Sequence, residues 1–239
     1  GFICFGFGIG MSMTLLFLFI DSYLGFGYAF ALLYVISHIF SISSVGLWAV
    51  LANRWGKKTV WGIAMSLFII ALLGAGFLSP TNVNHIALLL CLTPFYCAYA
   101  AVMIIAPSLL SDVIDYSTWK FKRDRGATFF SLFTLITKTN GAIGGAVGLA
   151  LAGLYGFDAS ATVHSVESAF GLRLGLAWIP IPFLLLSFFI IVRMPINMRR
   201  HAIVRRALDR RLNRASKQPH NSNQHLTLPN HQANAVHST

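Results

Sequence analysis

GATFFSLFTLITKTNGAIGGAVGLALAGLYG occupies residues 126–156 and is rich in Gly, Ala, Phe and Leu. The stretch is long enough to cross a bilayer, since about 20 apolar residues at about 1.5 Å each span the hydrocarbon core. Lys138 is its only charged residue and lies near its centre. A charge there costs roughly 2.5 to 3.5 kcal/mol on insertion scales, so such a side chain normally faces a protein interior or a watery cavity. The stretch therefore predicts a membrane helix with a functional lysine.

The rest of the chain has the same apolar character. Of its 239 residues, 56% are apolar and 10% are charged, whereas soluble domains carry about 25% charged residues. We therefore expect an all-α, polytopic membrane protein with six spanning helices. The predicted spans are residues 2–20, 27–52, 59–79, 86–110, 127–155 and 172–194.

Basic residues gather at alternate ends of these spans. The three clusters lie within residues 54–58, 120–125 and 193–217. Such an asymmetry marks the cytoplasmic side of a membrane protein. We expect a multi-pass protein of the cell inner (plasma) membrane with a cytoplasmic C-terminus. The net charge of +11 then reflects topology, and we expect no nucleic-acid partner.

The predicted organisation has three parts. Residues 1–195 form the six-helix bundle, residues 196–215 a basic amphipathic cytoplasmic helix, and residues 216–239 a disordered polar tail. Gly1 stands directly in an apolar run without a basic region before it, so we expect no signal peptide and a start inside a longer protein.

Side chains suited to catalysis or metal binding are not grouped in this sequence. Cys4, Cys91 and Cys97 lie in apolar segments without metal-ligand spacing. We find no pairing of a nucleophile with a base and no phosphate-binding loop. We therefore expect a protein that is not an enzyme and holds no metal or other cofactor.

The helix around Lys138 has a polar flank. Counting back by four and seven residues reaches Thr134 and Ser131, and counting forward by three and seven reaches Gly141 and Gly145. The glycines form small-xxx-small patterns that let another helix approach closely. An ion pair is the alternative role for the lysine, but the sequence has no carboxylate at this depth. Its partner is then a ligand, water, a backbone carbonyl or a carboxylate outside this sequence.

Two other spans carry candidate polar or aromatic side chains. His38 lies on a polar flank of the span 27–52 and lines a pathway or, alternatively, hydrogen-bonds to a neighbouring helix. Tyr99 and Met103 lie between two prolines of the span 86–110. Proline kinks a membrane helix where cavity water or neighbours satisfy the freed carbonyl. Tyr99 and Met103 therefore either line a binding site or pack against neighbouring helices.

Several short motifs occur along the chain: SDVIDY at residues 111–116, WK at 119–120, FFSLF at 129–133, Lys138, and GLYGFD at 153–158. Together they resemble the glycoside/pentoside/hexuronide:cation symporter family of the major facilitator superfamily, in particular its melibiose permease-like members. The resemblance covers residues 1 to about 195 and corresponds to the C-terminal half of the family.

The resemblance implies a six-transmembrane-helix half of a major facilitator fold that works by alternating access. Its substrate, a sugar or glycoside, would lie between two halves near the midplane. Sodium or a proton would be the coupling ion, held in the missing N-terminal half. In this family the position matching Lys138 is functionally important and the one matching Thr134 lies near the sugar, while Met103 stands where a sugar-stacking tryptophan is found.

These considerations give a candidate site and its partners. We expect a small-molecule substrate, the lipid bilayer and the missing N-terminal six-helix half as partners. Asp112 and Asp115 would pair with the basic segment that contains Arg123 and Arg125 to form an inner gate. The candidate substrate-binding residues are Lys138, Thr134, Ser131, Met103, Tyr99 and His38.

Two other functions remain open from the sequence alone. The first is transport of an amphiphile such as a lysolipid, for which the apolar Met103 and the Phe-rich span 127–155 leave room. The second is a non-transporting membrane scaffold.

Overall fold

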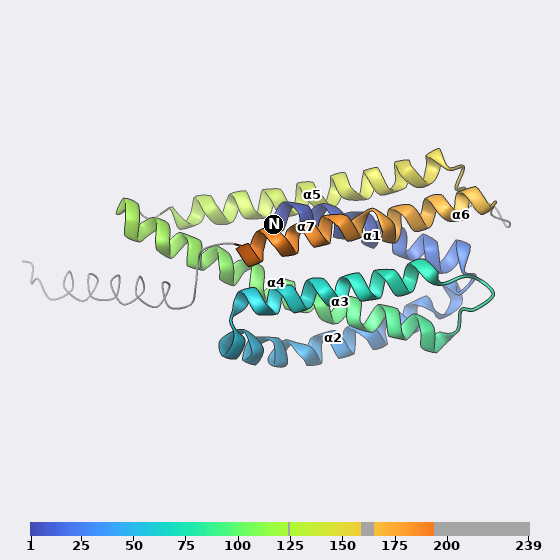
Figure 1. Ribbon diagram of the computed structural model, residues 1–239, viewed down its shortest axis with the longest axis horizontal. Helices are drawn as coiled ribbons and strands as arrows, with labels where there is room; N and C mark the ends of the chain where they lie inside the picture. Colours follow the sequence, from blue (N-terminus) through green and yellow to red (C-terminus); the bar gives the residue numbers. More distant parts are fainter. Residues whose placement is uncertain (124, 159–164, 194–239) are drawn as a thin grey trace, which may run out of the picture.

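Every regular element in the described part of the chain is helical (Figure 1). The computed structural model describes residues 1–123, 125–158 and 165–193. The predicted helix 196–215 and tail 216–239 lie outside these residues. The elements are α1 (Phe2–Leu18), the π-helical η1 (Phe19–Tyr23), α2 (Gly27–Trp55), α3 (Lys57–Phe77), α4 (His85–Phe121), α5 (Gly126–Leu154), α6 (Val166–Arg173), the π-helical η2 (Leu174–Trp178) and α7 (Pro180–Arg193).

The largest correction to the predicted boundaries concerns α4. It was expected to end at residue 110 but continues to Phe121. The segment from Ser111 onward contains no glycine or proline that would end a helix, and the turn comes only at Lys122, whose φ is 54°. The charged SDVIDY block therefore forms the last turns of a helix and is not a loop.

The last span also begins earlier than expected. The last predicted span began at residue 172, but α6 begins at Val166. The hydroxyl of Ser165 accepts a hydrogen bond from the backbone N–H of Ser168 at 3.1 Å, which caps the helix. The helix continues through η2 into α7, which begins at Pro180, where proline is tolerated because the first turn needs no backbone donor.

Five of the six predicted spans are long and apolar enough to cross a membrane by length and composition. They are Phe2–Tyr23, Gly27–Trp55, Lys57–Phe77, His85–Phe121 and Val166–Arg193. The exception is α5, although it has 29 residues. It contains Lys138, Asn140 and several hydroxyl side chains among its glycines. The chain is thus an all-α, polytopic membrane protein in which α5 carries the polar face.

The helices form two layers. In Figure 1, α7 and α3 lie in front of α1 and α4, while α5 and α2 lie at opposite edges. The contacts agree: α1 packs on α5 and α7, α3 packs on α4 and α7, and α4 packs on α2. The side of the bundle opposite α3 and α7 is therefore formed by α5, α1, α4 and α2.

A run of aromatic rings joins three of these helices in the core. Phe5 of α1 contacts Trp61 and Phe68 of α3 at ring-centroid distances of 5.6 and 5.7 Å. Phe68 in turn contacts Phe95 of α4 at 5.1 Å. All four side chains are buried. Aromatic rings at these separations add packing energy beyond their buried area, so α1, α3 and α4 are fixed to one another.

Glycines make the contact between α1 and α5. A Cβ placed on Gly144 would lie 2.4 Å from the carbonyl oxygen of Phe7, and one on Gly10 would lie 2.7 Å from that of Gly141. A Cβ on Gly145 would come within 2.5 Å of the Thr14 hydroxyl. The predicted close approach of a helix at these glycines is confirmed, and that helix is α1.

Arg173 ties the other end of the bundle together. Its Nη2 donates to the Tyr23 hydroxyl and, at 2.8 Å, to the Leu78 carbonyl. The guanidinium also lies 5.0 Å from the centre of the Tyr23 ring, a cation–π contact. Arg173 thus joins α6, η1 and the residue after α3.

Candidate functional site

Lys138 lies in the middle of α5 with an exposed side chain. No hydrogen bond or ion pair joins it to another residue of the described ranges. Ser131 and Thr134 on the same flank are exposed as well. Their hydroxyls donate to the carbonyls of Ala127 and Phe130, each at 2.9 Å, so both oxygens keep the capacity to accept hydrogen bonds. The flank therefore offers one cationic donor and two acceptors.

A chain of contacts shows that this flank shares a side with α1 and α2. Gly145, two turns along α5 from the lysine, packs against Thr14 of α1. One turn further along α1, Phe17 contacts Phe30 of α2 at 5.1 Å, and Phe30 contacts Tyr34 at 5.6 Å. The exposed flanks of the three helices are thus continuous on the side away from α3 and α7.

We call this side the open face. Its exposed or half-buried members come from four helices. They are Thr14 and Phe17 of α1, Tyr34 and His38 of α2, Met103 of α4, and Ser131, Thr134 and Lys138 of α5.

His38 is held between two tyrosines. Its ring centroid lies 4.0 Å from that of Tyr34 and 4.3 Å from that of Tyr96 of α4, and its Nδ1 lies 3.0 Å from the Tyr34 carbonyl oxygen. The hydroxyl of Ser41, one turn further along α2, donates to the Tyr96 carbonyl at 2.8 Å. Much of the polar flank of α2 therefore packs against α4. We call this contact the joint of α2 and α4, and His38 lies where it borders the open face.

Tyr99 and Met103 differ in their exposure. Tyr99 is half-buried against the core, whereas Met103, two turns along the flank of α4 from Tyr96, is 41% exposed. The predicted site residues thus form two groups on one side of the bundle. The first lies at the joint of α2 and α4, and the second, with Lys138, lies on α5 beyond α1.

An ion pair lies at the end of the bundle where the basic residues gather. Lys57 Nζ lies 2.5 Å from Asp112 Oδ1 and also donates to the Ser108 carbonyl at 3.0 Å. Asp112 is only 8% exposed. The pair joins the first residue of α3 to the extended end of α4, and we call it the inner pair.

The ion pair between Asp112 and Lys57 was not among the expectations for Asp112. It forms because α4 continues as a helix past residue 110 and keeps this carboxylate on its packed flank. The expected pairing of Asp112 with the basic segment at residues 120–125 stays a prediction. Arg123 and Arg125 are exposed at the turn after α4, and Asp115 is half-buried one turn from Asp112. A gating role for these three residues stays a prediction.

The turn before Lys57 determines its position. Gly56 lies between α2 and α3 with φ 91° and ψ 150°, a conformation that favours glycine because it has no Cβ. Lys57 was not predicted to be a site residue. Its signal was present in the basic turn at residues 53–58, which the predicted topology places at the same end as Asp112.

Neutralising the inner pair is expected to lower thermal stability. Lys57→Ala leaves a largely buried carboxylate without its ammonium, which costs roughly 1 to 3 kcal/mol. Lys57→Ala combined with Asp112→Asn should cost less than the sum of the two single changes. The melting temperatures of the four proteins in detergent, with Arg54→Ala as the control for loss of an exposed cation, measure the coupling. Strict additivity would show that the two side chains do not interact.

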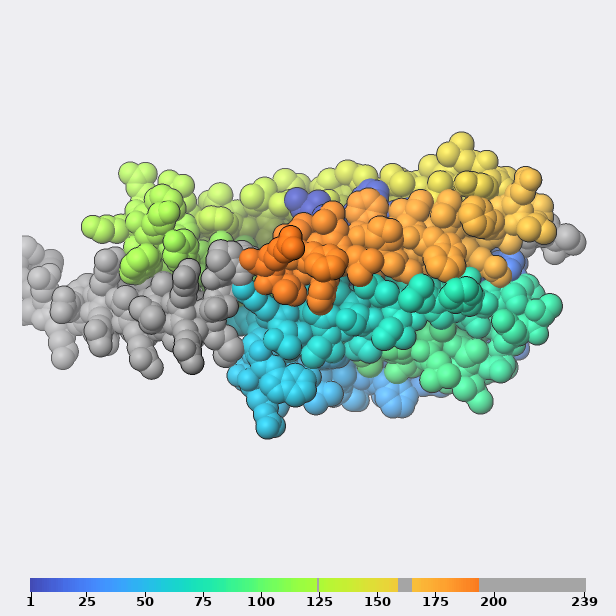
Figure 2. Space-filling model, in the orientation of Figure 1, coloured from blue at the N-terminus to red at the C-terminus, as the bar shows by residue number. Residues whose placement is uncertain are grey.

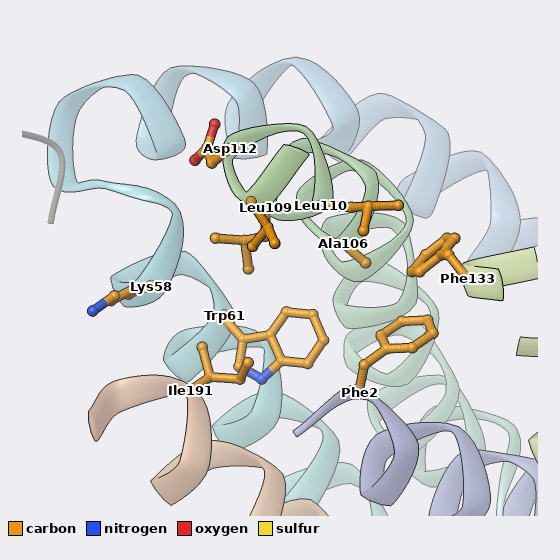
Figure 3. A pocket seen from close by; sticks show the side chains of 10 residues that line it. Phe2, Lys58, Trp61, Ala106, Leu109, Leu110, Asp112, Phe133 and Ile191 are labelled. Atoms are coloured by element: carbon orange, nitrogen blue, oxygen red, sulfur yellow. The ribbon is translucent and has the colours of Figure 1, made fainter. Parts of the chain in front are cut away.

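A cavity of about 150 Å³ lies beside the inner pair (Figure 3). Its walls are mainly apolar, and Lys58 and Asp112 are its charged lining residues. In Figure 3 the ammonium of Lys58 points away from the rings of Trp61, Phe2 and Phe133. Such a lining offers few hydrogen-bond partners to a polyhydroxylated ligand, so the open face is the better candidate site.

Comparison with known proteins identifies one family. Residues 1–198 match the family described as MFS/sugar transport protein. A search of the curated proteins finds no match to this chain.

Proposed function

Because the chain belongs to the MFS/sugar transport protein family, we propose that it serves in cation-coupled symport of a sugar or glycoside by alternating access. The chain is a multi-pass membrane protein of a transporter family, so its partners include a small-molecule substrate and the lipid bilayer. In the proposal it is the C-terminal half of a melibiose permease-like transporter. A second six-helix half covers the open face and holds the coupling sodium ion or proton.

The exposed position of Lys138 carries this proposal. Exposing an ammonium to lipid in the middle of a membrane helix costs free energy. Lys138 also lies too far from either end of α5 for its side chain to reach the membrane surface easily. The lysine therefore requires water, a ligand or a carboxylate on the open face. A substrate cavity between two helical units supplies all three.

The polar flank of α5 suits the chemistry of a sugar. Each sugar hydroxyl both donates and accepts hydrogen bonds, and Lys138 offers three donors while Ser131 and Thr134 offer acceptor oxygens. Hydrogen bonds from a charged donor are the stronger kind. Lys138 would thus bind hydroxyls directly or balance carboxylates of the other half when the coupling ion leaves.

The joint of α2 and α4 supplies the apolar part of the site. Tyr34 and His38, whose rings are in tilted contact, form an aromatic surface at the edge of the open face, and Met103 lies exposed on α4. The C–H groups of a pyranose ring pack well on such surfaces, so these side chains would orient the sugar while α5 binds its hydroxyls. Tyr99, half-buried beside them, would support this surface.

The inner pair would act as a gate on the cytoplasmic side. Alternating access requires contacts that break in one state and form in the other. Lys57 and Asp112 join α3 to α4 at the end where basic residues gather, which the positive-inside rule assigns to the cytoplasm. Opening toward the cytoplasm would separate the two side chains.

Uptake by the complete transporter in proteoliposomes tests this function. Radiolabelled glycosides should accumulate when a sodium or proton gradient is imposed and should not accumulate without one. A lysolipid serves as competitor, because transport of an amphiphile is the alternative. Accumulation that is independent of every ion gradient would contradict symport. Lysolipid uptake without sugar uptake would replace the substrate class.

Thr134→Val should raise the KM for the sugar several-fold and change kcat less. The substitution removes one acceptor from the open face, and a hydrogen bond contributes roughly 0.5 to 1.5 kcal/mol, or about 2- to 12-fold. Thr137→Val is the matched control, since Thr137 Oγ1 likewise donates to its own helix, at 2.7 Å to Phe133, but its side chain is half-buried whereas that of Thr134 is exposed. Equal effects of the two changes would indicate a general effect on α5.

A further inference from the structure

A groove runs between α3 and α7 on the side of the bundle opposite the open face. Figure 2 shows the two helices side by side along this surface. The groove encloses about 640 Å³ and is lined mainly by apolar side chains. Gly62 lies in its wall, where a Cβ would come within 3.0 Å of the Phe188 ring. The apolar lining residues are Ile63, Leu67, Ile70, Phe188 and Val192.

The surface around the groove is suited to lipid chains. Ile70 of α3 and Leu186, Phe189 and Ile190 of α7 are all exposed large apolar side chains. In a membrane protein such a surface contacts acyl chains. The hydroxyl of Ser66 in the groove donates to the Gly62 carbonyl at 3.1 Å, so it needs no polar ligand. A sugar would find little to bind here, whereas an acyl chain fits the lining.

One end of the groove is cationic. Lys58 lines this end together with Thr59, whose hydroxyl donates to the Trp55 carbonyl at 2.9 Å. Arg193 follows the lining residue Val192 in the last turn of α7, so it lies at the same end. No carboxylate is among the residues that line the groove. The charge at this end is therefore complementary to an anion.

We propose that the groove binds one anionic phospholipid of the bilayer. An acyl chain lies between α3 and α7, and the phosphate lies at Lys58 and Arg193. Basic residues at a membrane surface attract anionic headgroups, roughly fivefold in affinity for each charge. The bound lipid would hold the end of α3 next to Lys57 in place, and so would stabilise the inner pair.

Native mass spectrometry of the complete protein tests this site directly. The probes are phosphatidylglycerol and phosphatidylcholine with identical acyl chains, which differ only in headgroup charge. The unmodified protein should retain one phosphatidylglycerol in preference to phosphatidylcholine. Lys58→Ala combined with Arg193→Ala should lower phosphatidylglycerol retention about 25-fold, since each of the two charges contributes roughly fivefold. Ser66→Phe, which fills the groove but keeps both cations, should lower it as well.

Arg54→Ala is the matched control, because Arg54 is an exposed cation at the same end but belongs to α2 and does not line the groove. Its phosphatidylglycerol retention should equal that of the unmodified protein. Equal retention of the two lipids by the unmodified protein would overturn the proposal. Retention unaffected by the double alanine change or by Ser66→Phe would also overturn it.

Discussion

Replacing Lys138 by Ala is expected to abolish coupled sugar uptake while the protein still inserts into the membrane. The change removes the cation from the open face and is expected to leave the apolar contacts of α5 intact, since the Lys138 side chain is exposed. A hydrogen bond from a charged group contributes about 1.5 to 3 kcal/mol, or roughly 10- to 150-fold in binding. Loss of the charge balance with the other half would add to this. Uptake in proteoliposomes, normalised to the protein incorporated, measures the effect.

Two controls separate the role of Lys138 from a general effect of charge. Arg54→Ala removes an exposed cation in the last turn of α2 and should leave uptake unchanged. Lys138→Arg keeps the charge but changes the geometry of the donors, and should restore part of the uptake. Normal uptake by the Lys138→Ala protein would show that this lysine is not part of the substrate site.

Gly144→Val is expected to prevent stable folding of the bundle. Its side chain would require space that the Phe7 carbonyl oxygen occupies 2.4 Å from the first added carbon, with the Met11 backbone nitrogen at 3.2 Å. Backbone atoms on both helices cannot move aside as a flexible side chain could. We expect a destabilisation of roughly 2 to 5 kcal/mol, in the range of overpacked cores or above it. Monodispersity and melting temperature in detergent measure the outcome.

Gly153→Val provides the control in the same helix. A Cβ at Gly153 meets no atom within 4 Å, so the change should shift stability by less than about 1 kcal/mol. Equal melting temperatures for the Gly144→Val and Gly153→Val proteins would mean that α1 and α5 do not approach as closely as the glycines require.

The helices of this bundle could be predicted from the apolar runs because each run is long and its breaks are clear. The end of α4 could not. Apolar character ends near residue 110, but the helix continues to Phe121. A helix that leaves a membrane keeps its hydrogen bonds in any solvent, so the change of composition marks the membrane surface and not the helix end.

Contacts between distant segments were beyond the sequence. The glycine pattern on α5 predicted a close neighbour but could not identify α1, whose Gly10 completes the contact. Likewise, topology placed Lys57 and Asp112 at one end of the bundle, yet only the packing of α3 on α4 brings their charged atoms to 2.5 Å. Such pairings depend on helix rotation and depth, which local composition does not specify.

Some features of the candidate site could be predicted from the sequence and others could not. Ser131, Thr134 and Lys138 were predicted to share a flank, and helical geometry alone is sufficient for that prediction. His38 contacts the ring of Tyr96 on the neighbouring helix, but its Nδ1 lies 3.0 Å from the Tyr34 carbonyl oxygen of its own helix. That His38 lines a pathway stays a prediction.

Cysteine accessibility on the open face tests the central proposal most directly. In the complete transporter with Cys4, Cys91 and Cys97 replaced by Ala, Thr134→Cys should react with a membrane-impermeant maleimide, and the transported sugar should slow the reaction. Leu186→Cys, exposed on α7 on the opposite side, should not react, because it faces lipid. An unreactive Thr134→Cys, or a rate that the sugar leaves unchanged, would contradict a substrate cavity at this face.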